Sequence, residues 1–572
     1  MLTSLGIENF KGIANRQRID FAALTLLFGA NSAGKSTILH ALLFLHELIE
    51  RGHADIDRTE LGGNVLELGG FARLVHRHEI DRTIVLRAEF KTAGNLDLFG
   101  RGLLDFPFPD IEDEIDSAWL EFSIRHRRSP TFTGPLVDRL TVGVNDVDEP
   151  IVTVESGASL RETEPLYAQV NFLHPLLAPI RNDHPELWPA LVGNEPWPEG
   201  ISDDLVERRQ YFEANFEAMS VIALPQRELE RALGQDARSD DLAAVRWSPY
   251  FALSRSGVGA LPNYKEPLRV LPTRDLESDR EELASLHASS PLPEKEIATL
   301  EAHIAEQELA LKHVRTLLEI LLLGTIAQLA GFLRDAQYIG PLRTIPPRGF
   351  LYTRPGRTTS WADGLAAWDR LLADNLTLVE RTNEWLDRLN AGCKVVVQKM
   401  YRPGADAEDI TTEHVDHTVR RLLLDTGKDS LVLPSEVGAG ISQVLPVIVA
   451  ALEGRSGLTL VEQPEIHVHP ALQVELGDLL IEAASKAAGR RLLLIETHSE
   501  HLILRILRRV RETTDQELDQ DAPEFKQDRM SVLHVESTPD GARIRNLRVD
   551  DQGEFIDRWP KGFFAERMRE LL

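Results

Sequence analysis

The chain has 572 residues, 43% of them hydrophobic and 27% charged, and its 90 acidic and 63 basic residues give a formal charge of -27. This length allows one large domain with insertions or two to three lobes, and the acidic excess opposes a general DNA-binding surface. The single cysteine, Cys393, excludes an intramolecular disulfide and a cysteine-rich zinc site, which favours a reducing, cytoplasmic setting.

Two predicted strands, residues 2–10 and 18–28, open the chain and lead into a glycine-rich loop and a helix. From residue 83 to about 160, alternating apolar and polar segments predict an antiparallel β region. The predicted organisation has four parts. They are an N-terminal ATPase lobe at 1–165, a mostly helical insertion at 166–272, a helical arm at 273–336 and a C-terminal ATPase lobe at 337–572.

The predicted arm carries apolar residues at alternating steps of three and four, as in a coiled coil. Because three heptads are the lower limit for a coiled coil, an amphipathic helix lying on the domain is an equal alternative. The seam consists of Ile297, Leu300, Ile304, Gln307, Leu311, Val314, Leu318 and Leu321. The apolar run at 317–332 is shorter than the ~20 residues of a membrane-spanning helix, so it predicts a buried helix and no membrane association.

Residues 29–36, GANSAGKS, fit the phosphate-loop pattern G-x-x-x-x-G-K-[ST] and lie between a predicted strand and a predicted helix. Glycines let backbone N–H groups surround phosphates, Lys35 neutralises their charge, and the Ser36 hydroxyl can bind Mg²⁺. We therefore predict ATP and Mg²⁺ as cofactors. The predicted nucleotide-binding residues of this loop are Gly29, Asn31, Ser32, Ala33, Gly34, Lys35, Ser36 and Thr37.

A second chemical region begins where the apolar strand at 458–461 ends in Glu462. A carboxylate at a strand end can hold Mg²⁺ through water opposite the phosphate-loop serine, so Glu462 is a predicted metal residue together with Ser36. Gln463 follows, and an amide can orient a water molecule but cannot take its proton. Glu465, a substrate oxygen or a partner's base are alternatives for that step.

Two other segments near this strand present polar groups. A small-residue turn opens an apolar helix, and its Gly438, Gly440 and Ser442 can offer N–H and O–H donors to an anion. Another apolar strand starts at Arg491 and leads to His498, for which a functional role is favoured over a structural one.

Three further features carry weaker signals. His467 and His469 alternate, but no Cys or clustered ligand accompanies them, so we do not predict a metal site there. The basic runs at 125–128 and 505–511 are candidates for nucleic-acid contact, which would have to be local. Such runs are more often solvated faces.

These motifs occur in the order found in ABC-type ATPases of the SMC, RecF and OLD-like group, which both ends of the chain resemble. By this resemblance Glu462 is the Walker B carboxylate, Gln463 replaces the usual catalytic glutamate, and His498 is the switch histidine that senses the γ-phosphate. The turn at 438–442 resembles a variant ABC signature, which binds the γ-phosphate held by a second copy.

The resemblance implies an α/β fold, an ABC-type P-loop ATPase head with an antiparallel β subdomain, a helical insertion and a short coiled-coil-like arm. It also implies a homodimer or a higher even oligomer, because the signature cannot reach its own phosphate loop. The segments YIGPLR, EQPEIHVHP and ETHSEHLILR and the terminal WPKGFF resemble bacterial predicted AAA-family ATPases found in phage-defence operons.

We therefore expect a slow ATPase that gates a separate effector, a nuclease or a toxin. A Toprim nuclease within the chain is not expected, because residues 549–552 lack the D-x-D pair that follows the first glutamate of that domain. The alternative is a RecF-like, ATP-dependent DNA-binding protein of DNA repair, for which a salt-dependent duplex affinity is the discriminating observation.

Overall fold

The computed structural model describes residues 1–94, 96–100, 111, 113–156, 160, 166–171, 174–177, 251–270, 274–289, 293–348, 350–352, 359–373, 376–400, 419–427, 430–453, 457–486 and 491–559. The chain forms two compact units. One combines Met1–Glu47, Ile56–Ile80 and Gly331–Leu572, and the other combines Leu48–Asp55 and Asp81–Ala330. The predicted lobe at 1–165 is therefore divided, because its β region belongs to the same unit as the arm.

A six-stranded sheet with the order β11-β16-β17-β3-β18-β19 lies at the centre of the first unit. All its neighbouring strands pair in parallel except β18 and β19. Strands β3, β16 and β17 are buried along their whole length and rich in Leu, Val and Ile, as expected for strands covered on both faces. The strands are β11 (Gln337–Ile339), β16 (Gly457–Glu462), β17 (Arg491–Glu496), β3 (Leu24–Gly29), β18 (Met530–Thr538) and β19 (Gly541–Asn546).

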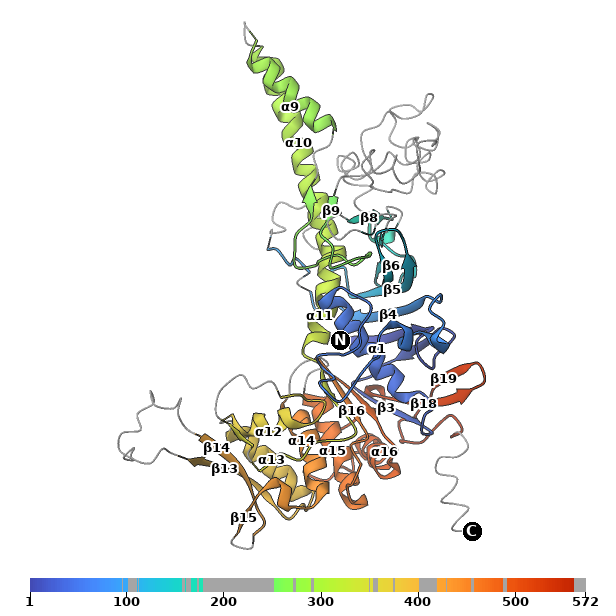
Figure 1. Ribbon diagram of the computed structural model, residues 1–572, viewed down its shortest axis with the longest axis vertical. Helices are drawn as coiled ribbons and strands as arrows, with labels where there is room; N and C mark the ends of the chain where they lie inside the picture. Colours follow the sequence, from blue (N-terminus) through green and yellow to red (C-terminus); the bar gives the residue numbers. More distant parts are fainter. Residues whose placement is uncertain are drawn as a thin grey trace, which may run out of the picture. The chain divides into compact units, whose positions relative to one another are not determined.

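Helices beside this sheet build the main hydrophobic core of the first unit (Figure 1). Helix α15 contacts β3 and β17 and packs along α16, while α14 lies against α12, α13 and α15. Leu26 and Phe28 of β3 share one core with Leu476 of α15 and Ile503 of α16. The helices of this core are α12 (Leu365–Leu372), α13 (Leu376–Arg388), α14 (Ala439–Glu453), α15 (Pro470–Lys486) and α16 (Glu500–Asp515), whereas α1 (Lys35–Arg51) and α2 (Phe71–Leu74) lie outside it.

Smaller β elements complete the first unit. The predicted strand at 2–10 is β1 (Leu2–Glu8), and the predicted strand at 18–28 is divided into β2 (Gln17–Asp20), which pairs antiparallel with β1, and β3 of the central sheet. A separate sheet has the order β12-β14-β13, with β15 paired to β14. Its strands are β12 (Leu351–Tyr352), β13 (Lys394–Met400), β14 (Val419–Asp425) and β15 (Leu431–Val432).

The second unit contains the predicted antiparallel β region, in which β4 to β10 pair consecutively. The side chains of β4 alternate between buried and less buried, so one face of this strand lies in a core. These strands are β4 (Ile84–Lys91), β5 (Ser117–Arg128), β6 (Thr133–Val144), β7 (Val152–Glu155), β8 (Leu166–Val170), β9 (Phe251–Leu253) and β10 (Arg269–Val270).

The predicted helical insertion at 166–272 differs from the structure where it is described. Its described residues form β8, β9, β10 and a short 3₁₀ turn, Pro175–Leu177, and contain no α-helix. Residues 178–250 lie outside the described residues, and so does most of that prediction. The described residues at the start and at the end of this segment are strands because they pair with other strands. Such pairing joins residues far apart in sequence, so helical periodicity does not reveal it.

The arm is a helical hairpin of α9 (Arg274–His287) and α10 (Glu294–Leu318). Arg280 pairs with Glu308 at 2.6 Å, and the seam residue Gln307 donates to Asp279 at 3.2 Å. None of the eight predicted seam residues is exposed. The coiled-coil alternative therefore describes the first half of α10, which packs on α9. The alternative of an amphipathic helix on the domain describes its second half, which is buried in its own unit.

The predicted buried helix at 317–332 continues α10 through a π-helical segment, Glu319–Gly324, into α11 (Thr325–Arg334). Glu319 is buried and accepts a hydrogen bond from the Leu268 N–H at 3.0 Å, so its charged group has a partner. The helical stretch Glu294–Arg334 is long and apolar enough to cross a membrane, but 78% of its apolar window is buried inside the protein. That burial is typical of a core helix.

Candidate nucleotide-binding site

The phosphate loop connects β3 to α1, as the motif requires. Gly29 and Gly34 have φ angles of 148° and 102°, a backbone that L side chains rarely adopt. A Cβ atom at Gly29 would lie 2.2 Å from the Val535 carbonyl oxygen of β18, so only glycine allows the loop to leave the sheet here. Among the other predicted loop residues, Asn31 and Ser32 are exposed, and Ala33 and Thr37 are buried.

Lys35 is the first residue of α1 and is buried, with 4% of its surface exposed. Its ammonium donates to the carbonyl oxygens of Gly29 and Ala30 at 3.2 and 3.0 Å. It also lies 3.6 Å from a carboxylate oxygen of Glu496. The cation is thus held at the mouth of the loop, where a phosphate would meet it.

Two carboxylates stand beside the loop at the ends of neighbouring parallel strands. Glu462 ends β16 and Glu496 ends β17, and the two residues are direct register partners. The Ser36 hydroxyl donates to Glu496 Oε2 at 2.7 Å and lies 3.5 Å from Glu462 Oε2. The predicted pairing of Ser36 with Glu462 is therefore found, but Glu496, which was not among the predicted site residues, lies closer.

Glu462 is held from its other side by Tyr338 of β11, whose hydroxyl donates to Oε1 at 2.8 Å. Burial, and then the charge of Glu496, raises the pKa of Glu462 to about 7. The same burial and the nearby Glu462 raise the pKa of Tyr338, which keeps its phenol protonated as a donor. The Walker B position is therefore a buried, fully bonded carboxyl.

The residues proposed for hydrolysis lie together after the strand ends. Gln463 has a φ of 46°, and its N–H donates to the Glu496 carbonyl oxygen at 2.7 Å. Glu465 accepts from the Thr497 hydroxyl at 2.8 Å and from the His498 N–H at 2.7 Å. Burial raises the pKa of Glu465, whereas burial and then Lys35 lower the pKa of His498 and keep its imidazole neutral. Glu465 therefore holds the turn that carries His498.

The predicted signature divides into an exposed and a buried part. Helix α14 begins at Ala439, next to the exposed Gly438. A Cβ atom at Gly440 would lie 2.6 Å from the His467 carbonyl oxygen, so a side chain there would displace the Walker B loop.

Ser442 is 0% exposed, and its hydroxyl donates to the Pro434 carbonyl oxygen at 3.3 Å. Its hydroxyl is therefore bound within its own chain, and its role toward a second copy stays a prediction.

Arg343 links the signature helix to the Walker B strand. Its guanidinium donates to the Glu462 carbonyl oxygen at 2.6 Å and to the Gln463 carbonyl oxygen at 3.2 Å. Its backbone exchanges two hydrogen bonds with the Gln443 side chain, at 3.1 and 2.6 Å. Burial lowers the pKa of Arg343 to about 10, which leaves it charged at neutral pH. The turn after β11 thus fixes two motifs that are far apart in sequence.

Sequence reasoning missed Glu496, Tyr338 and Arg343 as site residues. Glu496 carried the same signal as Glu462, a carboxylate at the end of a buried apolar strand. Tyr338 and Arg343 lie within the segment YIGPLR, which contributes to the resemblance but by itself indicates no role. Only their contacts with Glu462 show what they do.

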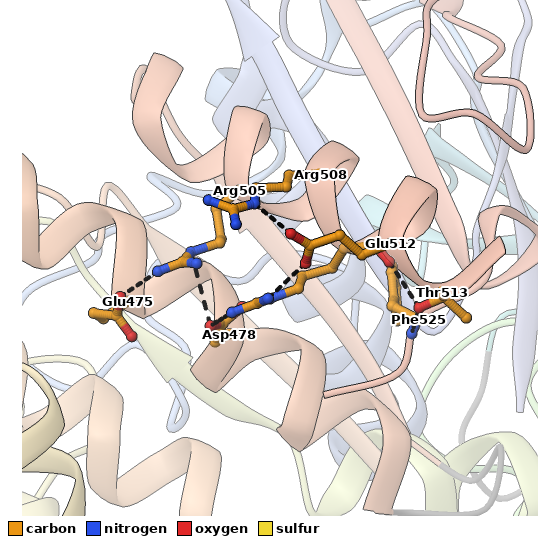
Figure 2. A network of polar contacts seen from close by, with 8 residues as sticks. Glu475, Asp478, Arg505, Arg508, Glu512, Thr513 and Phe525 are labelled. Carbon is orange, nitrogen blue, oxygen red and sulfur yellow. Dashed lines mark hydrogen bonds and ion pairs between the residues drawn. The ribbon is translucent and has the colours of Figure 1, made fainter. Parts of the chain in front are cut away.

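The basic run at 505–511 is divided, because Arg505 and Arg509 pair with acids of α15 (Figure 2), whereas Arg508 and Arg511 are exposed. Arg509 donates to both oxygens of Asp478 at 2.8 and 2.7 Å, and Arg505 pairs with Glu475. The run at 125–128 is also paired, because Arg125 and Arg127 contact Asp138 of β6 at 2.8 and 2.7 Å.

The donors beside Ser36 fit magnesium, which prefers oxygen ligands such as carboxylates and hydroxyls. Within the described residues no group of three or more His, Cys, Asp or Glu side chains could hold a metal. Mg²⁺ at this site would therefore depend on Ser36, the two carboxylates, water and phosphate oxygens.

Two family profiles match these segments. One, described as "AAA ATPase domain", matches residues 1–91, and the other, described as "AAA domain, putative AbiEii toxin, Type IV TA system", matches residues 380–505. Each of the two segments is thus similar to an AAA-family ATPase domain. The first match contains the phosphate loop, and the second contains the signature, Glu462 and His498.

The comparison with curated proteins finds no match. Among solved structures, the Smc head domain with an extended coiled coil from Pyrococcus furiosus is similar with a TM-score of 0.34 and 11% identity, covering 100% of this chain and 98% of that one. The SMC head domain from Thermotoga maritima has a TM-score of 0.32 and 9% identity, covering 96% of this chain and 99% of that one. The fold described above is mixed α/β, with a phosphate loop between β3 and α1.

Proposed function

We propose that this protein is a slow ATP-dependent switch that binds ATP and Mg²⁺ between two copies and gates a separate effector in cytoplasmic antiphage defence. The observation that carries the switch is Gln463, an amide at the position where a base is expected. The description of the family profile at 380–505 supports the defence context, since it names a toxin–antitoxin system. The effector would be a nuclease or a toxin.

The phosphate loop supplies the binding energy in this proposal. Backbone N–H groups between Gly29 and Ser36 and the α1 N-terminus receive the phosphates, and Lys35 neutralises their charge. Ser36 and the carboxylates of Glu462 and Glu496 would hold Mg²⁺ directly or through water. When bound, the ion neutralises charge that develops on the phosphate oxygens.

Hydrolysis is slow in this proposal because no free carboxylate follows Glu462. Gln463 orients a water molecule without accepting its proton, and both Glu465 oxygens already accept hydrogen bonds from the turn that carries His498. General-base catalysis typically contributes about 10²–10⁴-fold, so its absence leaves a long-lived ATP-bound state. Such a state can hold an effector until ATP is hydrolysed.

The test compares wild type with Gln463→Glu, using Gln463→Ala as the matched control. We expect Gln463→Glu to raise single-turnover hydrolysis by at least about 10-fold and to shorten the life of the ATP-bound dimer. Dimer lifetime is measured by size-exclusion chromatography after a chase with ADP. Fast wild-type hydrolysis that the glutamate does not increase would contradict the switch.

The two-copy site can be tested by mixing subunits. Gly438 is exposed, and a Cβ atom added there would meet nothing within 4 Å, so Gly438→Arg introduces bulk at the signature without an internal clash. Each of Gly438→Arg and Lys35→Ala alone should be inactive, and their mixture should regain part of the activity through heterodimers with one intact site. A mixture as inactive as its components would contradict a shared site.

The defence role needs a test in cells. Phage plaque counts are compared between cells that express the protein with its neighbouring gene and cells that express Lys35→Ala with the same gene. We expect protection only with the wild type. Salt-dependent binding of duplex DNA with no protection would instead support the DNA-repair alternative.

A further inference from the structure

We propose that Glu496, rather than Glu462, is the carboxylate that contacts the divalent cation of the nucleotide site. The proposal rests on ATP and Mg²⁺ binding in the proposed function, but not on slow turnover, dimerisation or an effector. The sequence places Glu462 in the usual Walker B position, so the assignment of Glu496 comes from the geometry of the sheet.

The strand order makes Glu496 the nearer carboxylate. Strand β17 lies between β16 and β3, so the end of β17 is one strand away from the phosphate loop and the end of β16 is two strands away. Neighbouring strands are about 4.8 Å apart, which places the two backbones about 5 and 10 Å from that of β3. The hydroxyl of Ser36 is accordingly 2.7 Å from Glu496 and 3.5 Å from Glu462.

The hydrogen-bond and ion-pair partners of the two carboxylates also favour Glu496 as the one that faces the loop. Glu462 is held on its far side by the buried Tyr338 hydroxyl at 2.8 Å, which draws one of its oxygens away from the loop. Glu496 directs both oxygens at the loop: Oε2 accepts from Ser36, and Oε1 lies 3.6 Å from Lys35. Glu496 therefore faces the two side chains that define the phosphate and metal positions.

A structural alternative gives Glu496 only the role of an ion-pair partner for Lys35. The two roles separate in a binding experiment. Removing an ion-pair partner of Lys35 changes the nucleotide affinity both with and without metal. Removing a metal ligand changes only the metal-dependent part of that affinity. A carboxylate near phosphates also repels them, so its removal should leave metal-free nucleotide affinity unchanged or slightly higher.

The experiment measures Mn²⁺ binding by electron paramagnetic resonance on full-length protein saturated with AMP-PNP. We expect Glu496→Gln to raise the Kd for Mn²⁺ by about 10-fold or more, and Glu462→Gln to raise it less. Glu475→Gln, which removes a carboxylate paired with Arg505 elsewhere in the unit, is the matched control and should not change it. Affinity for a fluorescent ATP analogue in EDTA is measured alongside.

An unchanged Kd for Mn²⁺ in Glu496→Gln, or a larger loss in Glu462→Gln, would overturn the assignment. Weaker nucleotide binding in EDTA with unchanged Mn²⁺ binding would overturn it in favour of the ion-pair role. Glu496→Asp keeps the charge on a shorter side chain, and an intermediate Kd there supports the assignment if Glu496→Gln does not fold. Wild type that binds Mn²⁺ and nucleotide but hydrolyses ATP fast would overturn only the slow switch.

Discussion

Carboxylates lie beside cations both at the carboxyl ends of β16 and β17, next to the phosphate loop, and in the contact between α15 and α16. The two regions balance these charges differently. Between the helices, Glu475, Asp478 and Glu512 face Arg505, Arg508 and Arg509 in a closed set of ion pairs (Figure 2). At the sheet edge, two carboxylates share one serine hydroxyl, and Lys35 contacts one of them at 3.6 Å.

The difference separates a structural cluster from a site. Three acids matched by three arginines leave little net charge, so the helix pair has no reason to bind an ion. Two adjacent carboxylates repel each other unless a proton or a cation compensates them, and the raised pKa of Glu462 shows this repulsion together with burial. Substitutions in the two regions should therefore have different consequences.

The largest effect is expected at the site. Lys35→Ala removes the cation that receives phosphate, and we expect ATP affinity to fall by more than about 100-fold, which is about 2.7 kcal/mol. The thermal midpoint of the apo protein should stay close to that of the wild type, and a fluorescent ATP analogue measures the affinity. Near-normal affinity would show that the loop backbone alone holds the nucleotide.

The next effect is expected at the helix pair. Arg509 is 6% exposed and Asp478 is 7% exposed, so Arg509→Ala removes both hydrogen bonds to a buried carboxylate, which keeps only Arg505 at 3.7 Å, and should cost about 3 kcal/mol of stability. Arg508, which is 53% exposed, is the matched control, and Arg508→Ala should cost no more than about 1 kcal/mol.

Chemical denaturation measures both variants, and nucleotide affinity should not change in folded Arg509→Ala. If nucleotide affinity falls with stability intact, the helix pair is part of the site.

A smaller effect concerns pH in the absence of metal. Because the pKa of Glu462 is raised from 4.5 to about 7, the folded state binds the proton more tightly than the unfolded state. Its contribution to stability is complete below about pH 4.5, falls as the pH rises to about 7 and is lost above that. In EDTA the thermal midpoint should therefore decline more between pH 5 and 8 in wild type than in Glu462→Gln. Parallel declines would show that Glu462 is ionised throughout.

Local features of the chain carried the prediction of the nucleotide site. The spacing of Gly29, Gly34 and Lys35 between a strand and a helix is enough to specify a phosphate loop, because each part of that motif is local. The ends of apolar strands indicated Glu462 and His498 in the same way. The heptad spacing from Ile297 likewise predicted a buried helical seam, since the residues that face a partner helix recur at a fixed period.

Ser442 shows where local reasoning was insufficient. The turn pattern identified the start of a helix. Successive residues of a helix are about 100° apart around its axis, so the pattern does not indicate which of them faces the core. With α14 beginning at Ala439, Ser442 lies in the core and Gly438 remains at the surface. The spacing of the basic run at 505–511 likewise does not reveal that Arg505 and Arg509 pair with acids of α15.

The sequence by itself determined which side chains stand at strand ends and helix starts, because backbone geometry near a motif depends on a few neighbouring residues. Only the tertiary structure decided which of those ends meet. Strand β17 comes after β16 along the chain but lies between β16 and β3 in the sheet, and this insertion brings Glu496 to Ser36. Strand order depends on packing between segments hundreds of residues apart, which no local pattern encodes.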